Sequence, residues 1–107
     1  MKNREELPIK KGQAFTDEVR EIATQMGVLR SLNTSCELAR QYFPTRRDIR
    51  VILEVDPEEN SESLTIEISV EGTPEDVANQ YDRFIDAFLE RIPADDQLKI
   101  GLLASAV

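Results

Sequence analysis

Hydrophobic and polar residues alternate along two neighbouring segments of the chain, RDIRVILEV and SLTIEISVEG. In each segment every second residue is apolar, which is typical of a strand with one buried face. These apolar positions are Ile49, Val51, Leu53 and Val55 in the first segment and Leu64, Ile66, Ile68 and Val70 in the second. The turn-rich segment DPEENSES lies between them, so the pattern predicts an antiparallel hairpin. We expect a register in which the residue numbers of each cross-strand pair add up to 119, so that Val55 lies opposite Leu64.

Helical spacing of apolar residues predicts helices before the hairpin. Thr16 can cap a first helix, with acidic residues following it in the first turn. Thr34 and Glu37 have the capping-box pattern, which predicts the start of a second helix. That helix should end near Tyr42, because the residue before Pro44 disfavours helical geometry. The pattern leaves open whether residues 16–43 form two helices or one bent helix.

A third helix and a third strand are predicted after the hairpin. Thr73 and Pro74 form a strong helix start, and Pro93 ends the helix. Its inward-facing stripe comprises Val77, Tyr81, Phe84, Ile85, Phe88 and Ile92. The following segment, LKIGLLASAV, is apolar on most of both faces and predicts the third strand. The fold class is therefore α+β, in the order α-α-β-β-α-β. The linking helix could place the third strand beside the first and antiparallel to it, which gives a small three-stranded sheet of order 2-1-3 covered by helices on one face.

Length and composition indicate one folded domain. The chain has 107 residues, and 40% of them are hydrophobic. Residues 1–14 contain Pro8 and Gly12 without periodicity, so we expect a flexible tail before a single domain over residues 15–107. No apolar run approaches the ~20 residues that span a bilayer, and the charged first residues are unlike a secretory signal. Cys36 is the only cysteine, which excludes an internal disulfide and favours a reducing, cytoplasmic location.

Charge is distributed unevenly between the two halves of the chain. Residues 1–53 hold ten basic and seven acidic residues, whereas residues 54–107 hold three basic and fourteen acidic residues. The net charge of −8 therefore arises from the second half, which carries −11. An acidic surface repels phosphate backbones, so nucleic-acid binding is not expected of the protein as a whole.

Three short motifs stand out in the last two-thirds of the chain: RQYFP at residues 40–44, ILEVDPE at residues 52–58, and DRF at residues 82–84 followed by Leu89. They resemble motifs of small prokaryotic proteins from toxin–antitoxin-like gene pairs. The resemblance covers about residues 37–103. It implies an antitoxin-like role in binding a partner protein, and it brings no catalytic residues.

A helix-turn-helix regulator using residues 16–43 is the alternative function. The segment EIATQMGVLRS resembles the first half of such a motif, with Ala23 four residues before Gly27. However, Asn33 occupies a position where an apolar residue should pack against the first helix. The region also carries a net charge of −1, whereas a recognition helix brings several phosphate contacts.

Other candidate sites have ordinary structural explanations. The arginines near the first strand could bind an anion or RNA, but such residues more often pair with local acids such as Asp48 and Glu71. The loop at residues 56–63 approaches the spacing of a calcium loop, but it lacks the glycine of the sharp turn. Cys36 is expected to be a core thiol, because the chain has no histidine to activate it. A carboxylate-based enzyme is a third possibility. We expect no catalysis, no cofactor and no metal.

One helix face is more acidic than stability alone would favour. The outer side of the third helix carries the carboxylates of Glu75, Asp82, Asp86 and Glu90, and two successive pairs, Asp82–Asp86 and Asp86–Glu90, have four-residue spacing. Like-charge pairs at this spacing each cost ~0.2–0.5 kcal/mol. The pattern predicts a protein-binding surface for a basic partner. The nearly uncharged segment Leu98–Val107 further predicts a homodimer if its strand lies at a sheet edge.

Overall fold

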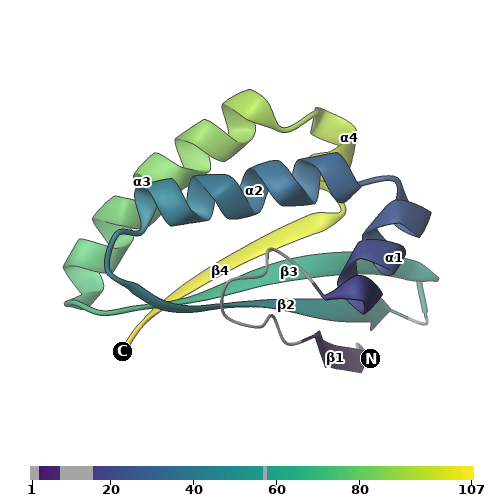
Figure 1. Ribbon diagram of the computed structural model, residues 1–107, viewed down its shortest axis with the longest axis horizontal. Helices are drawn as coiled ribbons and strands as arrows, with labels where there is room; N and C mark the ends of the chain where they lie inside the picture. Colours follow the sequence, from purple (N-terminus) through teal and green to yellow (C-terminus); the bar gives the residue numbers. More distant parts are fainter. Residues whose placement is uncertain (1–2, 8–15, 57) are drawn as a thin grey trace.

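The computed structural model describes residues 3–7, 16–56 and 58–107, and its strands form one mixed sheet. The strands lie in the order β1-β2-β3-β4 (Figure 1). Their bounds are β1 (Asn3–Leu7), β2 (Arg46–Asp56), β3 (Ser61–Val70) and β4 (Ile100–Ala106). β1 and β3 pair antiparallel with β2, whereas β4 pairs parallel with β3. The predicted α+β class is confirmed. β2, β3 and β4 are the three predicted strands, and β1 extends their sheet.

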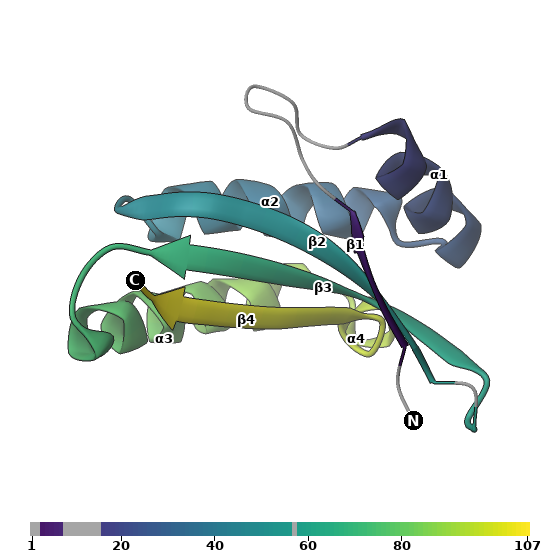
Figure 2. The same cartoon turned by 90° about the horizontal axis from the view of Figure 1, so that it is seen from below.

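The helices cover one face of the sheet. They are α1 (Asp17–Met26), α2 (Leu29–Tyr42), α3 (Pro74–Arg91) and the short α4 (Ala94–Gln97). Figure 2 shows the sheet in front, with α2 and α3 behind it. Alternate strand residues are buried against these helices: Val51, Leu53, Leu64, Ile66, Ile68 and Ile100. No helix in the described part of the chain is both long enough and apolar enough to cross a bilayer.

Residues 16–43 form two helices separated by a left-handed glycine. The predicted cap is confirmed, because Thr16 Oγ1 accepts a hydrogen bond of 3.2 Å from the Val19 N–H. Gly27 ends α1 with φ 75°, a conformation that glycine adopts without steric cost. The predicted second start at Thr34 is wrong, because α2 begins at Leu29. The turn at Gly27 is tight enough for α2 to start at once, which lets its first turn join the core.

The hairpin register differs from the prediction by two residues. Leu53 lies opposite Leu64 and Val51 opposite Ile66, so paired positions sum to 117 instead of 119. A shift of two leaves every side chain on its predicted face, so alternation could not distinguish the two registers. The turn distinguishes them. Asp56 Oδ1 accepts hydrogen bonds from the N–H groups of Glu58 (3.0 Å) and Glu59 (3.4 Å), which closes a loop shorter than predicted.

The predicted strand order 2-1-3 is wrong. The last strand, β4, lies beside β3 and parallel to it, not beside β2. The edge of β2 that the prediction assigned to this strand is occupied by β1. No strand was predicted within residues 1–14, because Asn3–Leu7 lacks an alternating apolar pattern. Residues 1–2 and 8–14, the rest of the expected tail, lie outside the described residues.

Candidate protein interface

Helix α3 carries the predicted binding residues, and its start is fixed by side chains. Thr73 Oγ1 accepts a hydrogen bond of 3.1 Å from the Asp76 N–H, and Asp76 Oδ2 accepts one of 3.4 Å from the Thr73 N–H. This is a capping box, with Pro74 in the first turn. The helix start predicted from the sequence is confirmed. Asp76 therefore has a structural role and is not counted with the binding residues.

The inner side of α3 is held by aromatic packing. Phe84 is fully buried, and its ring lies edge-on to that of Phe43, with the centroids 5.2 Å apart. Phe88 follows one turn later, at 6.4 Å from the Phe84 ring. Phe43 is the C-cap of α2, so this cluster fixes α3 against that helix. The orientation of the outer side of α3 follows from these contacts.

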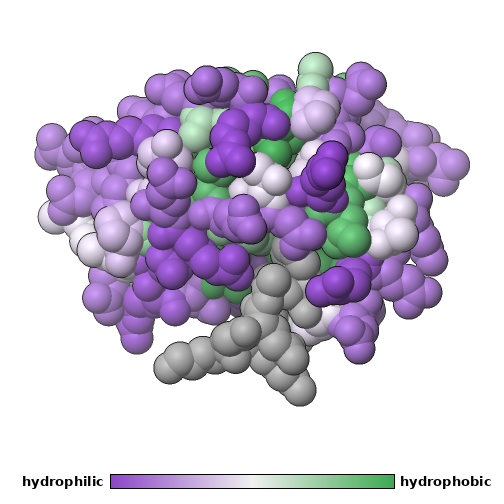
Figure 3. Space-filling model, turned by 45° about the horizontal axis from the view of Figure 1, so that its top comes forward, coloured by the Kyte–Doolittle hydropathy of each residue, from purple (hydrophilic) through white to green (hydrophobic). Residues whose placement is uncertain are grey.

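The four predicted binding residues lie on the outer side of α3. Glu75, Asp82, Asp86 and Glu90 are all exposed, and we call this set the α3 acidic face. Among the described residues none of the four carboxylates forms an ion pair. Asp96 on α4 differs from them, because its carboxylate accepts a short hydrogen bond from Ser31 Oγ. In Figure 3 the surface over the helices is largely hydrophilic, with apolar residues visible between them.

A second exposed side of α3 is apolar, which was not predicted from the sequence. Its residues are Ala78, Tyr81, Ile85 and Leu89, which we call the α3 apolar side. Tyr81 and Ile85 were predicted to face the core, but both are only half-buried, and Leu89 is 54% exposed. The spacing of three and four residues along this line could have revealed it, because it runs beside the buried line of Val77, Phe84 and Phe88.

The α3 apolar side borders a groove against β4. The groove has a volume of about 410 Å³ and is lined by Pro74, Val77, Ala78, Tyr81, Leu103, Ala104 and Ala106. At its floor the Tyr81 hydroxyl donates a hydrogen bond of 3.5 Å to the carbonyl oxygen of Leu102. Burial raises the pKa of Tyr81, so this hydroxyl stays protonated and able to donate at neutral pH. Every residue that lines the groove is uncharged.

The arginines near the start of β2 mostly bind groups of the protein itself. Arg47 pairs with Glu71 at 3.4 Å, and Arg50 pairs with Asp48 at 3.6 Å and with Glu67 at 3.0 Å. Pairing with Asp48 and Glu71 is therefore confirmed. Arg46 instead donates to the carbonyl oxygens of residues 40 and 43, which end α2. These contacts account for the positions of Arg46, Arg47 and Arg50 without a bound anion.

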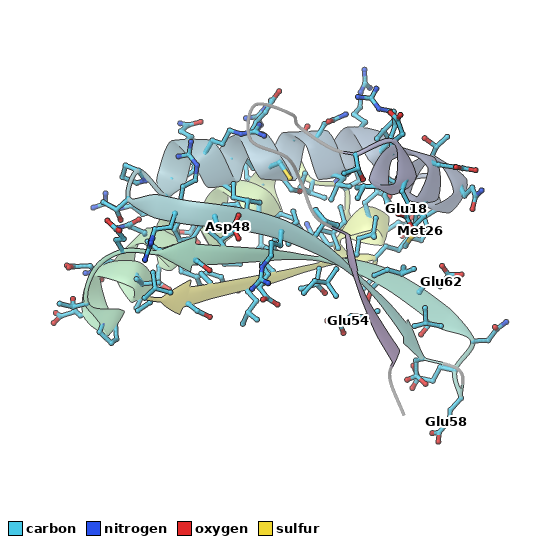
Figure 4. The ribbon with its side chains drawn as sticks, turned by 60° about the horizontal axis from the view of Figure 1, so that its bottom comes forward. Glu18, Met26, Asp48, Glu54, Glu58 and Glu62 are labelled. Carbon is cyan, nitrogen blue, oxygen red and sulfur yellow. The ribbon has the colours of Figure 1, made fainter. Side chains whose placement is uncertain are left out.

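The acidic hairpin does not form a metal site in the part of the chain that the structure describes. No group of three potential ligands comes together there in an arrangement that could hold a metal ion. In Figure 4, Glu58 lies at the tip of the hairpin, away from Glu54 and Glu62. Asp56 uses its carboxylate for the turn described above. The spacing that resembled a calcium loop is thus part of a hairpin turn.

Cys36 lies in the hydrophobic core. Its side chain is 1% exposed, and burial raises the pKa of the thiol to about 12, although the nearby Arg40 opposes this shift. The thiol is therefore neutral at physiological pH. This position agrees with the expected core thiol.

The region with helix-turn-helix spacing contributes much of its surface to the core. Leu32, Leu38 and Ala39 of α2 are buried in the hydrophobic cluster. Asn33, the residue that departs from the motif, is half-buried. Of the arginines in this region, Arg40 is exposed at the end of α2. The DNA-binding alternative stays a prediction.

Comparison of the chain with protein-family models, with curated proteins and with solved structures gives no significant match.

Proposed function

We propose that this protein is a non-catalytic, cytoplasmic interaction protein that binds a basic partner protein through the α3 acidic face. The proposal includes self-association as a homodimer. It is in keeping with the antitoxin-like role that the sequence resemblance implies. The observation that supports it most is the absence of ion pairs at Glu75, Asp82, Asp86 and Glu90 among the described residues.

The cost of this arrangement argues for a role outside folding. Asp82 and Asp86 are four residues apart, as are Asp86 and Glu90, and each like-charge pair costs ~0.2–0.5 kcal/mol. The core contacts of α3 come from its opposite side, through Phe84 and Phe88. The acidic residues therefore contribute nothing to packing. A surface that binds a cationic partner explains why they are clustered.

The proposed partner is a protein with a positively charged surface. Clustered negative charge speeds the diffusional encounter with such a surface, and it repels nucleic acid. Binding at the α3 acidic face could therefore compete with RNA or DNA for the same basic surface of the partner. Because the attraction acts between exposed charges, it should weaken as salt is raised.

The test replaces three members of the acidic face. The immobilised protein captures partners from a cell extract, the basic partner is identified and purified, and its affinity is measured by titration. We expect the variant Asp82→Lys, Asp86→Lys, Glu90→Lys to fold normally, because all three side chains are exposed. We expect its affinity for the partner to fall at least ~100-fold, since attraction becomes repulsion.

A matched control makes the same change of charge elsewhere. Glu58, Glu59 and Glu62 on the β2–β3 hairpin are also exposed, and replacing them with lysine alters the net charge equally. This control should keep most of the affinity. An equal loss of affinity in both variants would show that only the net charge of the protein matters. An unchanged affinity in the α3 variant would show that the partner does not bind at the α3 acidic face.

A further inference from the structure

Strand β4 has no neighbouring strand on its outer side in the part of the chain that the structure describes. The Leu64 N–H donates to the Lys99 carbonyl at 2.8 Å, and the Val107 N–H donates to the Val70 carbonyl at 2.9 Å. In a parallel ladder these bonds recur at every second residue, so the odd-numbered residues of β4 face β3. The N–H and C=O groups of Ile100, Leu102, Ala104 and Ala106 therefore point away from β3, and of these the Leu102 carbonyl accepts the hydrogen bond from the Tyr81 hydroxyl. Figure 2 shows β4 along this outer edge.

This edge lacks the features that normally prevent strand pairing. Residues 100–107 contain neither a charge nor a proline. Leu103 is 45% exposed on the face of the sheet opposite the helices. On the helix side, the apolar groove, which includes Ala78 and Tyr81 of α3, continues the same uncharged surface. The edge thus combines backbone groups that bond to no described strand with exposed apolar side chains.

The outward groups match those of a second copy of the same strand. The middle of β4 is Leu103, so antiparallel pairing about this residue places Leu102 opposite Ala104 and Ile100 opposite Ala106. Each such pair exchanges two N–H···O bonds, in which the Leu102 carbonyl accepts a second hydrogen bond besides the one from Tyr81. The two Leu103 residues then face each other in a pair without hydrogen bonds, where Cα atoms are ~4.5 Å apart and side chains are closest.

The carboxylates of the α3 acidic face do not line the groove beside β4, so like charges do not repel a second copy at this edge. Around α3, Ala78 and Tyr81 line this groove instead. A foreign strand would need its own apolar residue opposite Leu103. A second copy supplies that residue by symmetry, which makes it the occupant that the edge fits best.

We propose that two copies of this chain pair antiparallel through β4, centred on Leu103, to form one continuous sheet. This inference rests on the self-association included in the proposed function and specifies its geometry. The symmetry axis places both α3 helices on the same side of the joined sheet. The dimer therefore presents two α3 acidic faces in one direction, which suits a partner with two basic sites.

The test compares two lysine variants on the same strand and the same face. Leu103→Lys puts two like charges opposite each other and removes the central apolar contact, whereas Ser105→Lys faces Gly101 of the second copy. Sedimentation equilibrium of the full chain, without partner, measures the dimer dissociation constant. We expect Leu103→Lys to raise it at least ~30-fold and Ser105→Lys to change it less than ~threefold. Circular dichroism checks that both variants fold.

Cross-linking tests the register independently. Leu103→Cys should form a disulfide-linked dimer under mild oxidation, because Cα atoms in such a pair lie within disulfide range. Ser105→Cys should not, and the native chain should not, because Cys36 is buried. A native chain that stays monomeric at tens of micromolar would overturn this inference along with the proposed self-association. A dimer that survives Leu103→Lys, or that cross-links through residue 105 instead of 103, would overturn the pairing alone. None of these results bears on capture of the basic partner.

Discussion

The two exposed sides of α3 differ in chemistry although they share one helix. The acidic face carries carboxylates that have no ionic partner among the described residues, and the apolar side carries Leu89 and the half-buried Tyr81. Charged groups in water gain little from one another, whereas exposed apolar groups gain by being covered. The first side is suited to a partner of opposite charge and the second to a partner of similar polarity. One helix can therefore serve two kinds of contact at once.

The two edges of the sheet differ in the same way. β1 is five residues long, with the sequence NREEL, and three of those residues are charged. β4 is longer, with the sequence IGLLASA, and has no charge. Charge and shortness are common protections of a sheet edge. The contrast favours β4 over β1 as the edge for the proposed self-association.

The largest effect is expected from Phe84→Ala, which removes the support that both sides of α3 share. Phe84 is fully buried between Phe43 and Phe88. Truncating a buried phenylalanine costs ~3–5 kcal/mol of unfolding free energy. Urea denaturation should show this loss, with capture and dimerisation falling together. If one activity survived intact in this variant, the two sides would not depend on the same packing.

A smaller effect is expected from Gly101→Ala, which acts on β4 alone. A Cβ atom at residue 101 would lie 2.7 Å from Thr65 Oγ1, which itself donates to Glu54 at 3.0 Å. We expect overpacking to cost ~1–3 kcal/mol in urea denaturation and to weaken the dimer, with capture preserved.

Thr65→Ala provides the control for this clash. In the double variant the methyl group introduced at residue 101 has room, so the combined destabilisation should be less than the sum of the two single effects. Additive effects would show that the close approach of residues 65 and 101 does not limit the pairing of β3 with β4.

The smallest effects are expected from single substitutions at Leu89 and Glu90, two adjacent residues that belong to the apolar side and the acidic face of α3. Leu89→Gln and Glu90→Gln should each change stability by less than ~0.5 kcal/mol, because both side chains are exposed. Leu89→Gln should weaken dimerisation a few-fold and leave capture unchanged, whereas Glu90→Gln should do the reverse. Sedimentation and titration on the same two proteins measure this. Parallel changes in both assays would mean that the sides are not separate.

The starts of α1 and α3 and the faces of the strands could be predicted from the sequence because they depend on residues only a few positions apart. Thr16 and Thr73 cap helices through contacts three residues away, and these could be identified from spacing alone. Strand faces followed from alternation. The hairpin register did not, because a shift of two residues keeps the faces and only the turn at Asp56 distinguishes the alternatives.

The strand order depended on contacts distant in sequence. β4 pairs with β3, and β1 occupies the other edge of β2, but Asn3–Leu7 has no alternating pattern that would have identified it as a strand. Similarly, α2 starts before Thr34 because the turn at Gly27 is tight and the first turn of α2 packs into the core.

The exposure of the α3 acidic face could be predicted from the sequence, but the exposure of the neighbouring apolar side could not. Periodicity placed Asp82, Asp86 and Glu90 on the outer side of α3, where they are exposed. The same periodicity assigned Tyr81 and Ile85 to the core. Their half-exposure follows from the position of β4 at the sheet edge, which leaves one flank of α3 uncovered. That position could not be derived without the strand order.

The most direct test of separate roles for the two sides is the salt dependence of both equilibria, measured on the native protein from about 50 mM to about 500 mM salt. Capture of the purified basic partner depends on attraction between exposed charges, so its affinity should fall as salt rises. Dimerisation joins two chains of net charge −8 through uncharged surfaces, so screening should strengthen it. Opposite slopes for the two equilibria are the predicted result. Partner affinity that does not change with salt, or that rises with it, would contradict the assignment of the α3 acidic face.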